Sequence, residues 1–241
     1  MKNALKTNLP ISNTVFAIDC VVFGFEEGEL KTLLIERTEE PYRGCWTLPG
    51  YLVVDQGESI DEAANRVLCK LTGLTNAYLE QVYTYTNIDR YAESRVISVV
   101  YYAMIRLDGI LDSQHIASYT RNAALVPVNE LPELGFDHAS ILERVLKKVR
   151  RKVLYYPIAF ELLPEKFTLT QLQSLYEAIL GRKVDKRNFR KKIMSHQILM
   201  DLNEKQKDVS YRAAKLFKLD KKKHAQVVEH EFSFSEYETS I

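Results

Sequence analysis

The chain has 241 residues, 46% of them hydrophobic, and a formal net charge of +1. This length suffices for two domains of ordinary size. No apolar run reaches the roughly eighteen residues of a membrane span, no secretory leader opens the chain, and the three cysteines form neither a CxxC pair nor a Cys/His cluster. We therefore expect a reduced, cytoplasmic protein without a membrane segment, a metal site or a cofactor.

The charge is unevenly divided along the chain. Residues 1–150 carry 15 Lys and Arg against 20 Asp and Glu, and residues 151–223 carry 18 against 8. Residues 224–241 contain four acids and neither Lys nor Arg. The excess of ten positive charges in the middle segment is typical of a region that meets a polyanion, although solvated lysines alone would give the same imbalance.

The first half alternates between strand and helix patterns. Apolar, β-branched runs at 14–23 and 31–37 are joined by a turn-prone segment, which predicts a hairpin with Gly28 at its tip. A helix is predicted over about residues 59–72, and Gly73 is expected to end it as a C-cap. Further strands are predicted at 78–85, 95–105 and 123–128.

The last helix of this half is predicted to begin with Asp137 as its N-cap and to bury one apolar stripe. The stripe consists of Ile141, Leu142, Val145, Leu146 and Val149. The basic run that ends this helix complements the helix dipole, so we do not count it as a nucleic-acid site. The pattern predicts an α+β domain over residues 1–155, with a mixed sheet and flanking helices.

Residues 154–167 contain two prolines and no clear period, which places a domain junction there. Thr168 and Gln171 then form a capping-box pattern, and apolar residues follow at helical spacing as far as Gly181. This pattern predicts the first helix of a second domain.

A second helix is predicted at 186–196, with Asp185 as its N-cap and Phe189 and Ile193 on its buried side. Its opposite face carries Arg187, Asn188, Arg190 and Lys191. Two helices joined by a short turn, the second basic and facing outward, indicate a helix-turn-helix.

Two short strands are predicted at 198–203 and 209–219, on either side of a charged turn at 204–208. Such a pair directly after the second helix is typical of a wing. In a winged helix the second helix enters the major groove, and the wing follows the phosphates. We therefore predict a winged-helix domain over 156–223 and a poorly ordered acidic tail over 224–241; the alternative is a packed helix pair with a solvated face.

Residues 48–74, LPGYLVVDQGESIDEAANRVLCKLTGL, resemble the Nudix box of pyrophosphohydrolases. Glu58, Arg66 and Gly73 stand at the separations that the box requires. Its three metal-binding glutamates would share one helix face, and the chain has Val67, Lys70 and Leu71 at those positions. Without a bound cation, little offsets the charge of phosphoryl chemistry, so we do not expect an enzyme.

With the basic second half, the chain resembles the Nudix-related transcriptional regulators of bacteria, and most closely the sugar-responsive ones of Bacteroidetes. The resemblance covers about residues 12–220 and rests on WTLPG, the box, and the segments at 89–105, 133–138 and 167–193. Such regulators repress genes of NAD metabolism or pentose catabolism and leave DNA when a small molecule binds the Nudix domain. The resemblance implies a repressor, dimeric on a near-palindromic operator, whose effector is a pentose or an ADP-ribose-like nucleotide sugar.

The resemblance also assigns site residues. The groove-reading residues would be Lys186, Arg187, Asn188, Arg190 and Lys191, with Arg212 and Lys215 as wing contacts. The effector-binding residues would be Arg37, Trp46, Tyr51, Glu58, Asp89, Arg90, Arg95 and His138. An ordinary structural role is the alternative for each, such as a core position for Trp46 or a place beside the helix start for His138.

Two hypotheses of other classes compete with the regulator. The first is a Nudix hydrolase of ADP-ribose or nucleotide sugars with relocated acids, because Asp55, Glu58, Asp61 and Glu62 lie at or near the start of the box helix. The second is a binding module whose basic half meets RNA or an acidic protein.

Overall fold

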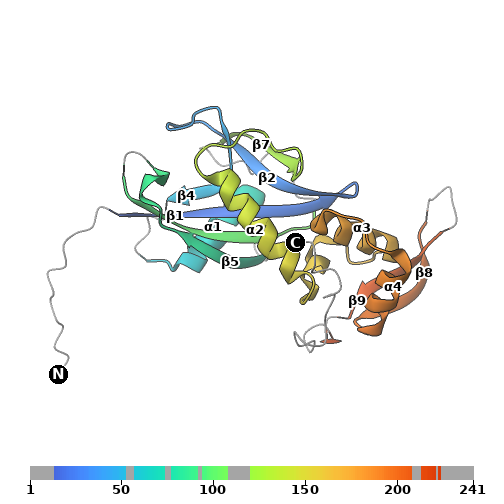
Figure 1. Cartoon of the computed structure of the whole chain (residues 1–241). Helices are drawn as coiled ribbons and strands as arrows, with labels where there is room; N and C mark the ends of the chain where they lie inside the picture. Colours follow the sequence, from blue (N-terminus) through green and yellow to red (C-terminus); the bar gives the residue numbers. More distant parts are fainter. Residues whose placement is uncertain are drawn as a thin grey trace, which may run out of the picture.

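A computed structural model of the chain describes residues 14–52, 57–73, 77–91, 94–107, 120–207, 213–220 and 222–223. Its largest element is a seven-stranded mixed sheet (Figure 1). The strands are β1 (Val15–Glu26), β2 (Glu29–Arg37), β3 (Trp46–Thr47), β4 (Gly50–Leu52), β5 (Tyr78–Tyr85), β6 (Val96–Met104) and β7 (Thr120–Pro127). β1 runs parallel to β6 and antiparallel to β2, so the predicted hairpin and the predicted mixed sheet are confirmed.

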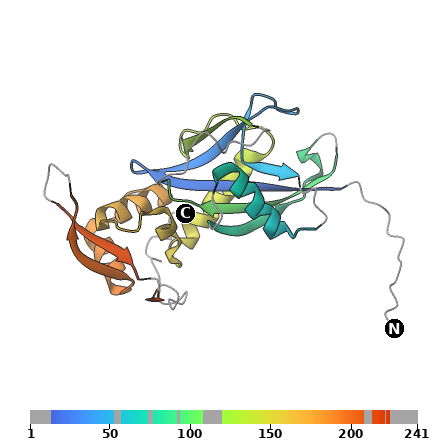
Figure 2. The same ribbon diagram turned by 180° about the vertical axis from the view of Figure 1, so that it is seen from behind.

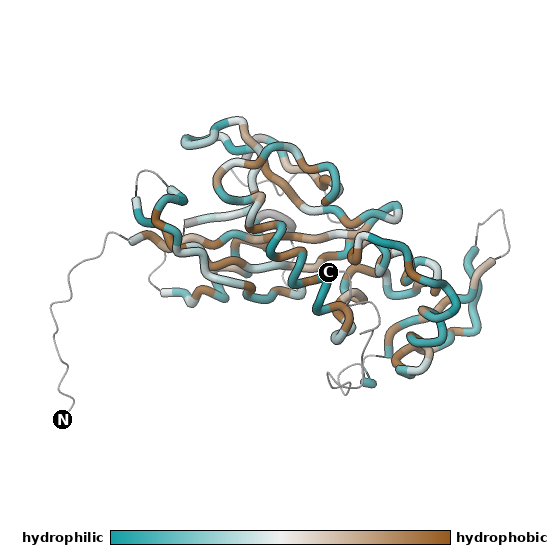
Figure 3. Tube along the Cα trace, viewed as in Figure 1, coloured by the Kyte–Doolittle hydropathy of each residue, from teal (hydrophilic) through white to brown (hydrophobic). Residues whose placement is uncertain are grey.

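Two helices cover opposite faces of the sheet, α1 (Ile60–Thr72) and α2 (His138–Lys152), as the two views in Figures 1 and 2 show. Side chains of a strand alternate between its faces, and β1 serves both layers in this way. Ile18, Cys20 and Val22 pack in one buried cluster with residues of α1, whereas Val21 and Phe23 pack in another with residues of α2. In Figure 3 the central strands are mainly hydrophobic, and hydrophilic residues gather on the outer helices.

Local capping explains where α1 begins and ends. The Ser59 side chain accepts from the backbone N–H of Glu62, whose carboxylate accepts in return from the Ser59 backbone, and Gly73 ends the helix in the left-handed conformation. α2 begins after Asp137, which is its N-cap residue as predicted, but the Asp137 side chain makes no capping hydrogen bond. Its carboxylate instead accepts two hydrogen bonds from the guanidinium of Arg90, which also pair opposite charges.

The C-terminal elements lie beyond one end of the sheet (Figure 1). They are η3 (Pro157–Leu162), α3 (Leu169–Leu180), α4 (Lys186–Ser195), β8 (Leu199–Lys205) and β9 (Lys215–Leu219). The predicted capping box of Thr168 with Gln171 and the predicted cap at Asp185 are both present. β8 and β9 form an antiparallel pair after α4, which confirms the winged helix-turn-helix, although β9 begins later than predicted.

One cluster of buried residues continues from the sheet through α2 and η3 into α3 and α4. It includes Tyr102 of the sheet, Val149 of α2, Phe160 of η3 and Phe189 of α4. The two predicted domains therefore share a core where they meet. Their boundary at residue 155 stays a prediction, and the predicted tail over 224–241 lies outside the described residues. Within the described ranges, no helix is long and apolar enough to cross a membrane.

Candidate functional site

A pocket opens where two neighbouring strands separate. β1 and β2 pair only near their hairpin, and beyond it β4 pairs with β1 while β3 pairs with β2. A cavity of about 120 Å³ lies at this split, lined by β1, β2, the β3–β4 segment, the start of β6, the residues that end η1 (Ile88–Arg90) and the start of α2. We call this cavity the candidate pocket.

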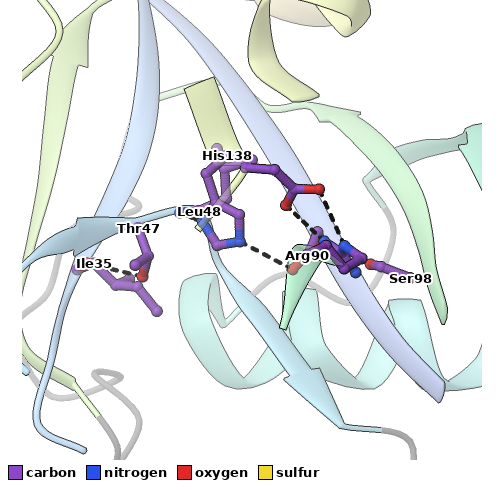
Figure 4. A network of polar contacts seen from close by, with 8 residues as sticks. Ile35, Thr47, Leu48, Arg90, Ser98 and His138 are labelled. Carbon is purple, nitrogen blue, oxygen red and sulfur yellow. Dashed lines mark hydrogen bonds and ion pairs between the residues drawn. The ribbon is translucent and has the colours of Figure 1, made fainter. Parts of the chain in front are cut away.

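A buried carboxylate organises one wall of the candidate pocket. Asp19 of β1 is only 6% exposed, and its Oδ2 accepts from Ser98 Oγ at 2.5 Å and from Arg90 Nη2 at 3.2 Å. Arg90 also binds Asp137, with Nε to Oδ2 at 3.0 Å and Nη2 to Oδ1 at 2.8 Å. Burial opposes ionisation of Asp19, but His138, Ser98 and Arg90 outweigh it and hold its pKa below the ordinary value. Figure 4 shows Arg90, Ser98 and His138 in this network.

His138, the first residue of α2, has a defined tautomer. The backbone N–H of Leu48 donates to its Nδ1 at 2.9 Å, so Nδ1 is an acceptor and the ring proton lies on Nε2. Nε2 lies 3.5 Å from Asp19 Oδ1. The histidine therefore ties the start of α2 to both the β3–β4 segment and β1.

Aromatic rings form another wall of the candidate pocket around Phe136, whose ring centroid lies 5.1 Å from that of His138. Phe136 has φ 57°, a left-handed conformation that non-glycine residues seldom adopt and that is enriched at functional sites. Its ring stacks with Tyr91 at 6.1 Å and contacts Tyr42 at 4.5 Å, while the Arg37 guanidinium lies 5.1 Å from its centroid. This wall offers flat apolar surface and a cation, which suit a sugar or base ring.

The structure brings four of the predicted effector residues together in the candidate pocket: Arg37, Tyr51, Arg90 and His138. The other four are not among its lining residues. Trp46 is half-buried against the core, Glu58 binds Arg66 with 2.9 Å between Oε2 and Nε, and Asp89 and Arg95 are exposed.

Sequence reasoning missed Asp19, Phe136 and Asp137 as site residues. A lone acid within the apolar run at 14–23 was a usable signal for Asp19. The segment at 133–138, ELGFDH, contains both of the others, and the sequence identified it only as a motif of the family.

The box helix does not offer the ligands of a divalent cation at the three expected positions. Val67 is 2% exposed and packs in the core, and Lys70 presents an ammonium at the surface, 5.8 Å from the Tyr51 ring. The side chain of Leu71 lies outside the described part. Across the described residues, no group of three or more His, Cys, Asp or Glu could hold a metal ion.

The second candidate site is the outer face of α4. Phe189 and Ile193 are fully buried against the core, which fixes the orientation of the helix. Four of the predicted groove-reading side chains are exposed on α4: Lys186, Arg187, Asn188 and Lys191. A helix with one anchored apolar face and one cationic face has the form of a recognition helix.

Three predicted DNA contacts have other surroundings. Arg190 is half-buried, and its Nη2 donates to Thr170 Oγ1 of α3 at 3.2 Å. Lys215 Nζ lies 2.9 Å from Asp201 Oδ2 across the wing strands. Arg212 lies outside the described residues. DNA contact by these residues stays a prediction.

A pocket between split strands of a helix-covered sheet, joined to a winged helix, defines a ligand-binding domain with an attached DNA-binding unit. The chain belongs to the Nudix family, because the NUDIX domain matches residues 14–145, more than half of its length. The NrtR DNA-binding winged helix domain matches residues 159–219. The resemblance inferred from the sequence is therefore confirmed at the level of these two domains.

Known proteins share the whole arrangement. The chain is 29% identical over 205 residues to the ADPR responsive transcriptional repressor NtrR of Acinetobacter baylyi, covering 85% of this chain and 81% of that one. NrtR of Shewanella oneidensis, in a crystal structure with a 27mer DNA, is 29% identical with a TM-score of 0.75, covering 87% and 95%. Its NUDIX domain, in a cocrystal structure with ADP ribose, is 28% identical with a TM-score of 0.50, covering 56% and 88%.

Proposed function

We propose that the chain is a DNA-binding transcriptional repressor that leaves DNA when an effector occupies the candidate pocket. The observation that carries this proposal is the shared core that joins a pocket-bearing Nudix domain to a helix with an exposed cationic face. The relatives support it, since one is a named repressor and another was crystallised with DNA. The groove-reading and pocket residues named above are part of the proposal.

ADP-ribose is the first candidate effector. One relative is described as ADPR responsive, and the NUDIX domain of another was crystallised with ADP ribose. In the candidate pocket, the Phe136 wall suits a ring, and Arg37 supplies a cation beside it.

A free pentose is the second candidate, favoured by two observations. The cavity of about 120 Å³ is smaller than the roughly 300–1,000 Å³ of ordinary ligand pockets. The charge of Arg90 is already matched by Asp19 and Asp137, which leaves less cationic character for a diphosphate. Carboxylates can accept hydrogen bonds from the hydroxyl groups of a neutral sugar, and an aromatic wall can pack against its ring.

A thermal-shift series separates these candidates. ADP-ribose, free ribose, arabinose and xylose are added to the whole chain, and a ligand at a hundred times its dissociation constant adds about 2.7 kcal/mol of apparent stability. The stabilising ligand should also release the chain from a duplex that it selects from a random-sequence library. Failure to select any duplex DNA, or selection of RNA instead, would contradict the proposed function.

We further propose that the Nudix domain binds its effector without hydrolysing it. The acids near the start of α1 have other partners: Glu58 binds Arg66, the Asp61 carboxylate accepts from the Tyr101 hydroxyl, and Glu62 caps the helix through Ser59. Asp55 lies outside the described residues. Incubation with ADP-ribose and Mg²⁺ or Mn²⁺ should give no AMP, and sustained turnover would support the hydrolase with relocated acids.

A further inference from the structure

Helix α2 extends from the candidate pocket to the C-terminal helices. Its N-terminal end is fixed by Asp137, which binds Arg90, and by His138, which accepts from Leu48. It contains 15 residues, so at 1.5 Å per residue its other end lies about 22 Å away. Ile141, Val145 and Val149 anchor it in the shared core along this length.

At that far end, Arg150 holds the C-terminus of α3. Its Nε donates to the backbone carbonyl of Ile179 at 2.9 Å, and its guanidinium packs on Gly181, where a Cβ would lie 3.0 Å from Nη2. The last carbonyls of a helix lack partners within the helix, and a cation there also complements the dipole. Arg150 therefore stabilises the C-terminus of α3. The sequence had indicated only that it complements the dipole of its own helix, α2.

The end of α3 is in turn fixed to the start of α4. Glu177 Oε1 accepts from the backbone N–H of Val184 at 3.2 Å, and its Oε2 lies 2.9 Å from Lys183 Nζ. Val184 directly precedes Asp185, whose side chain caps α4. Because of these contacts, a shift of the C-terminus of α3 should also move the start of α4.

We propose that Arg150 is the positioning residue that couples the candidate pocket to the DNA-binding helix, and that α2 is the rigid helix that links the two sites. This inference rests on the proposed function. An occupant of the pocket competes for the Arg90–Asp137 and Leu48–His138 contacts that fix the start of α2. Packed helices shift as rigid bodies by about 1–2 Å in such transitions, and Arg150 carries the shift to α3 and α4. The coupling free energy then depends on how differently the two arrangements of α2 bind the effector and the DNA.

A double-mutant cycle across α2 tests this coupling without knowledge of the effector. Asp137→Asn disturbs the pocket end, Arg150→Met removes the far contact, and both are combined. The readout is the Kd for the duplex that the wild-type chain selects from a random library. Asp137→Asn should weaken binding about fivefold or more in the wild-type background and less than about twofold in the Arg150→Met background.

Matched variants make the outcome decisive. Arg151 is exposed on the same turn, so Arg151→Met should leave the full Asp137→Asn effect in place. His138→Gln provides a second disturbance of the pocket end if Asp137→Asn fails to fold. If Arg150 only stabilises the packing of α2 on α3, Arg150→Met should lower the melting temperature, and the effect of Asp137→Asn on the Kd should be the same in both backgrounds. Equal effects in both backgrounds, or no effect of either pocket-end variant on DNA binding, would overturn the coupling. A wild-type chain that selects no duplex would refute the proposed function itself.

Discussion

At the scale of single residues, the feature with the widest reach is the buried carboxylate of Asp19. An unpaired buried charge is costly, and removing one partner of a buried pair typically destabilises a protein by several kcal/mol. Here Ser98, Arg90 and His138 come from three other segments and converge on this one side chain. Asp19 therefore contributes to stability and shapes the candidate pocket at the same time.

The contribution of Asp19 to stability should depend on pH. Its folded pKa lies below the ordinary value of 3.8, so the stabilisation is complete well above that value and is lost progressively as pH falls from about 5 toward the folded pKa. Asp19→Asn should lower the free energy of unfolding by about 3 kcal/mol at pH 7, and this difference should shrink as pH is lowered from about 5 toward 2. Urea unfolding at several pH values measures it. Glu143→Gln, which removes an exposed ion pair with Lys147, should have little effect, and a pH-independent Asp19→Asn difference would contradict the assignment.

Gly50 is the second residue whose identity the candidate pocket dictates. A Cβ at this position would lie 2.6 Å from Asp19 Oδ1 and 2.9 Å from the backbone oxygen of Ile18. Gly50→Ala should therefore displace β4 or the carboxylate, with a loss of about 1–3 kcal/mol in stability and loss of effector binding. Thermal melts with and without the stabilising ligand measure both. Gly50 has no positive φ, so the predicted loss comes from the close approach and not from backbone strain. Retained binding in Gly50→Ala would exclude the close approach as a requirement.

At the scale of elements, local chemistry was predictable from the sequence and distant chemistry was not. The N-caps of α3 and α4 were predicted because a capping side chain and its N–H partner lie within three residues. The N-cap position of Asp137 was predictable too, but the partner of its side chain, Arg90, was not, because it lies 47 residues away along the chain. Asp19 escaped notice because the split between β1 and β2, which exposes it to a cavity, depends on strand pairing rather than on local pattern.

The recognition helix contains two arginines with different surroundings, and they should respond differently to substitution. Arg187→Ala removes an exposed guanidinium and should weaken binding to the selected duplex by about 1–3 kcal/mol without changing the melting temperature. Arg190→Ala also removes the bond to Thr170, so it should lower the melting temperature as well. Lys147→Ala, on exposed α2 surface, is the control. Unchanged duplex affinity in the double variant Arg187→Ala with Arg190→Ala would refute α4 as the reading helix.

At the scale of the whole molecule, one hydrophobic core extends from the sheet through α2 into the winged helix, so the two candidate sites are joined by continuous packing. On the proposed coupling, a change in the candidate pocket alters the position of α4, and the exposed face of α4 remains separate from the ligand. A repressor that reads a near-palindromic operator must also present two such helices, since the symmetry of the protein matches that of the site. We therefore expect a homodimer in solution.

The dependence of DNA binding on salt tests the molecule as an assembled dimer. Each phosphate that a Lys or Arg neutralises contributes about −0.9 to the slope of log K against log salt concentration for duplex DNA. Lys191 is exposed on α4, so Lys191→Ala should make the slope shallower by about two units when both protomers bind, and by about one if a single chain binds. Fluorescence anisotropy on a palindromic duplex between roughly 50 and 200 mM salt measures the slope, with sedimentation to fix the stoichiometry. A salt-independent association would contradict phosphate contact and would favour the acidic-protein alternative for the basic half.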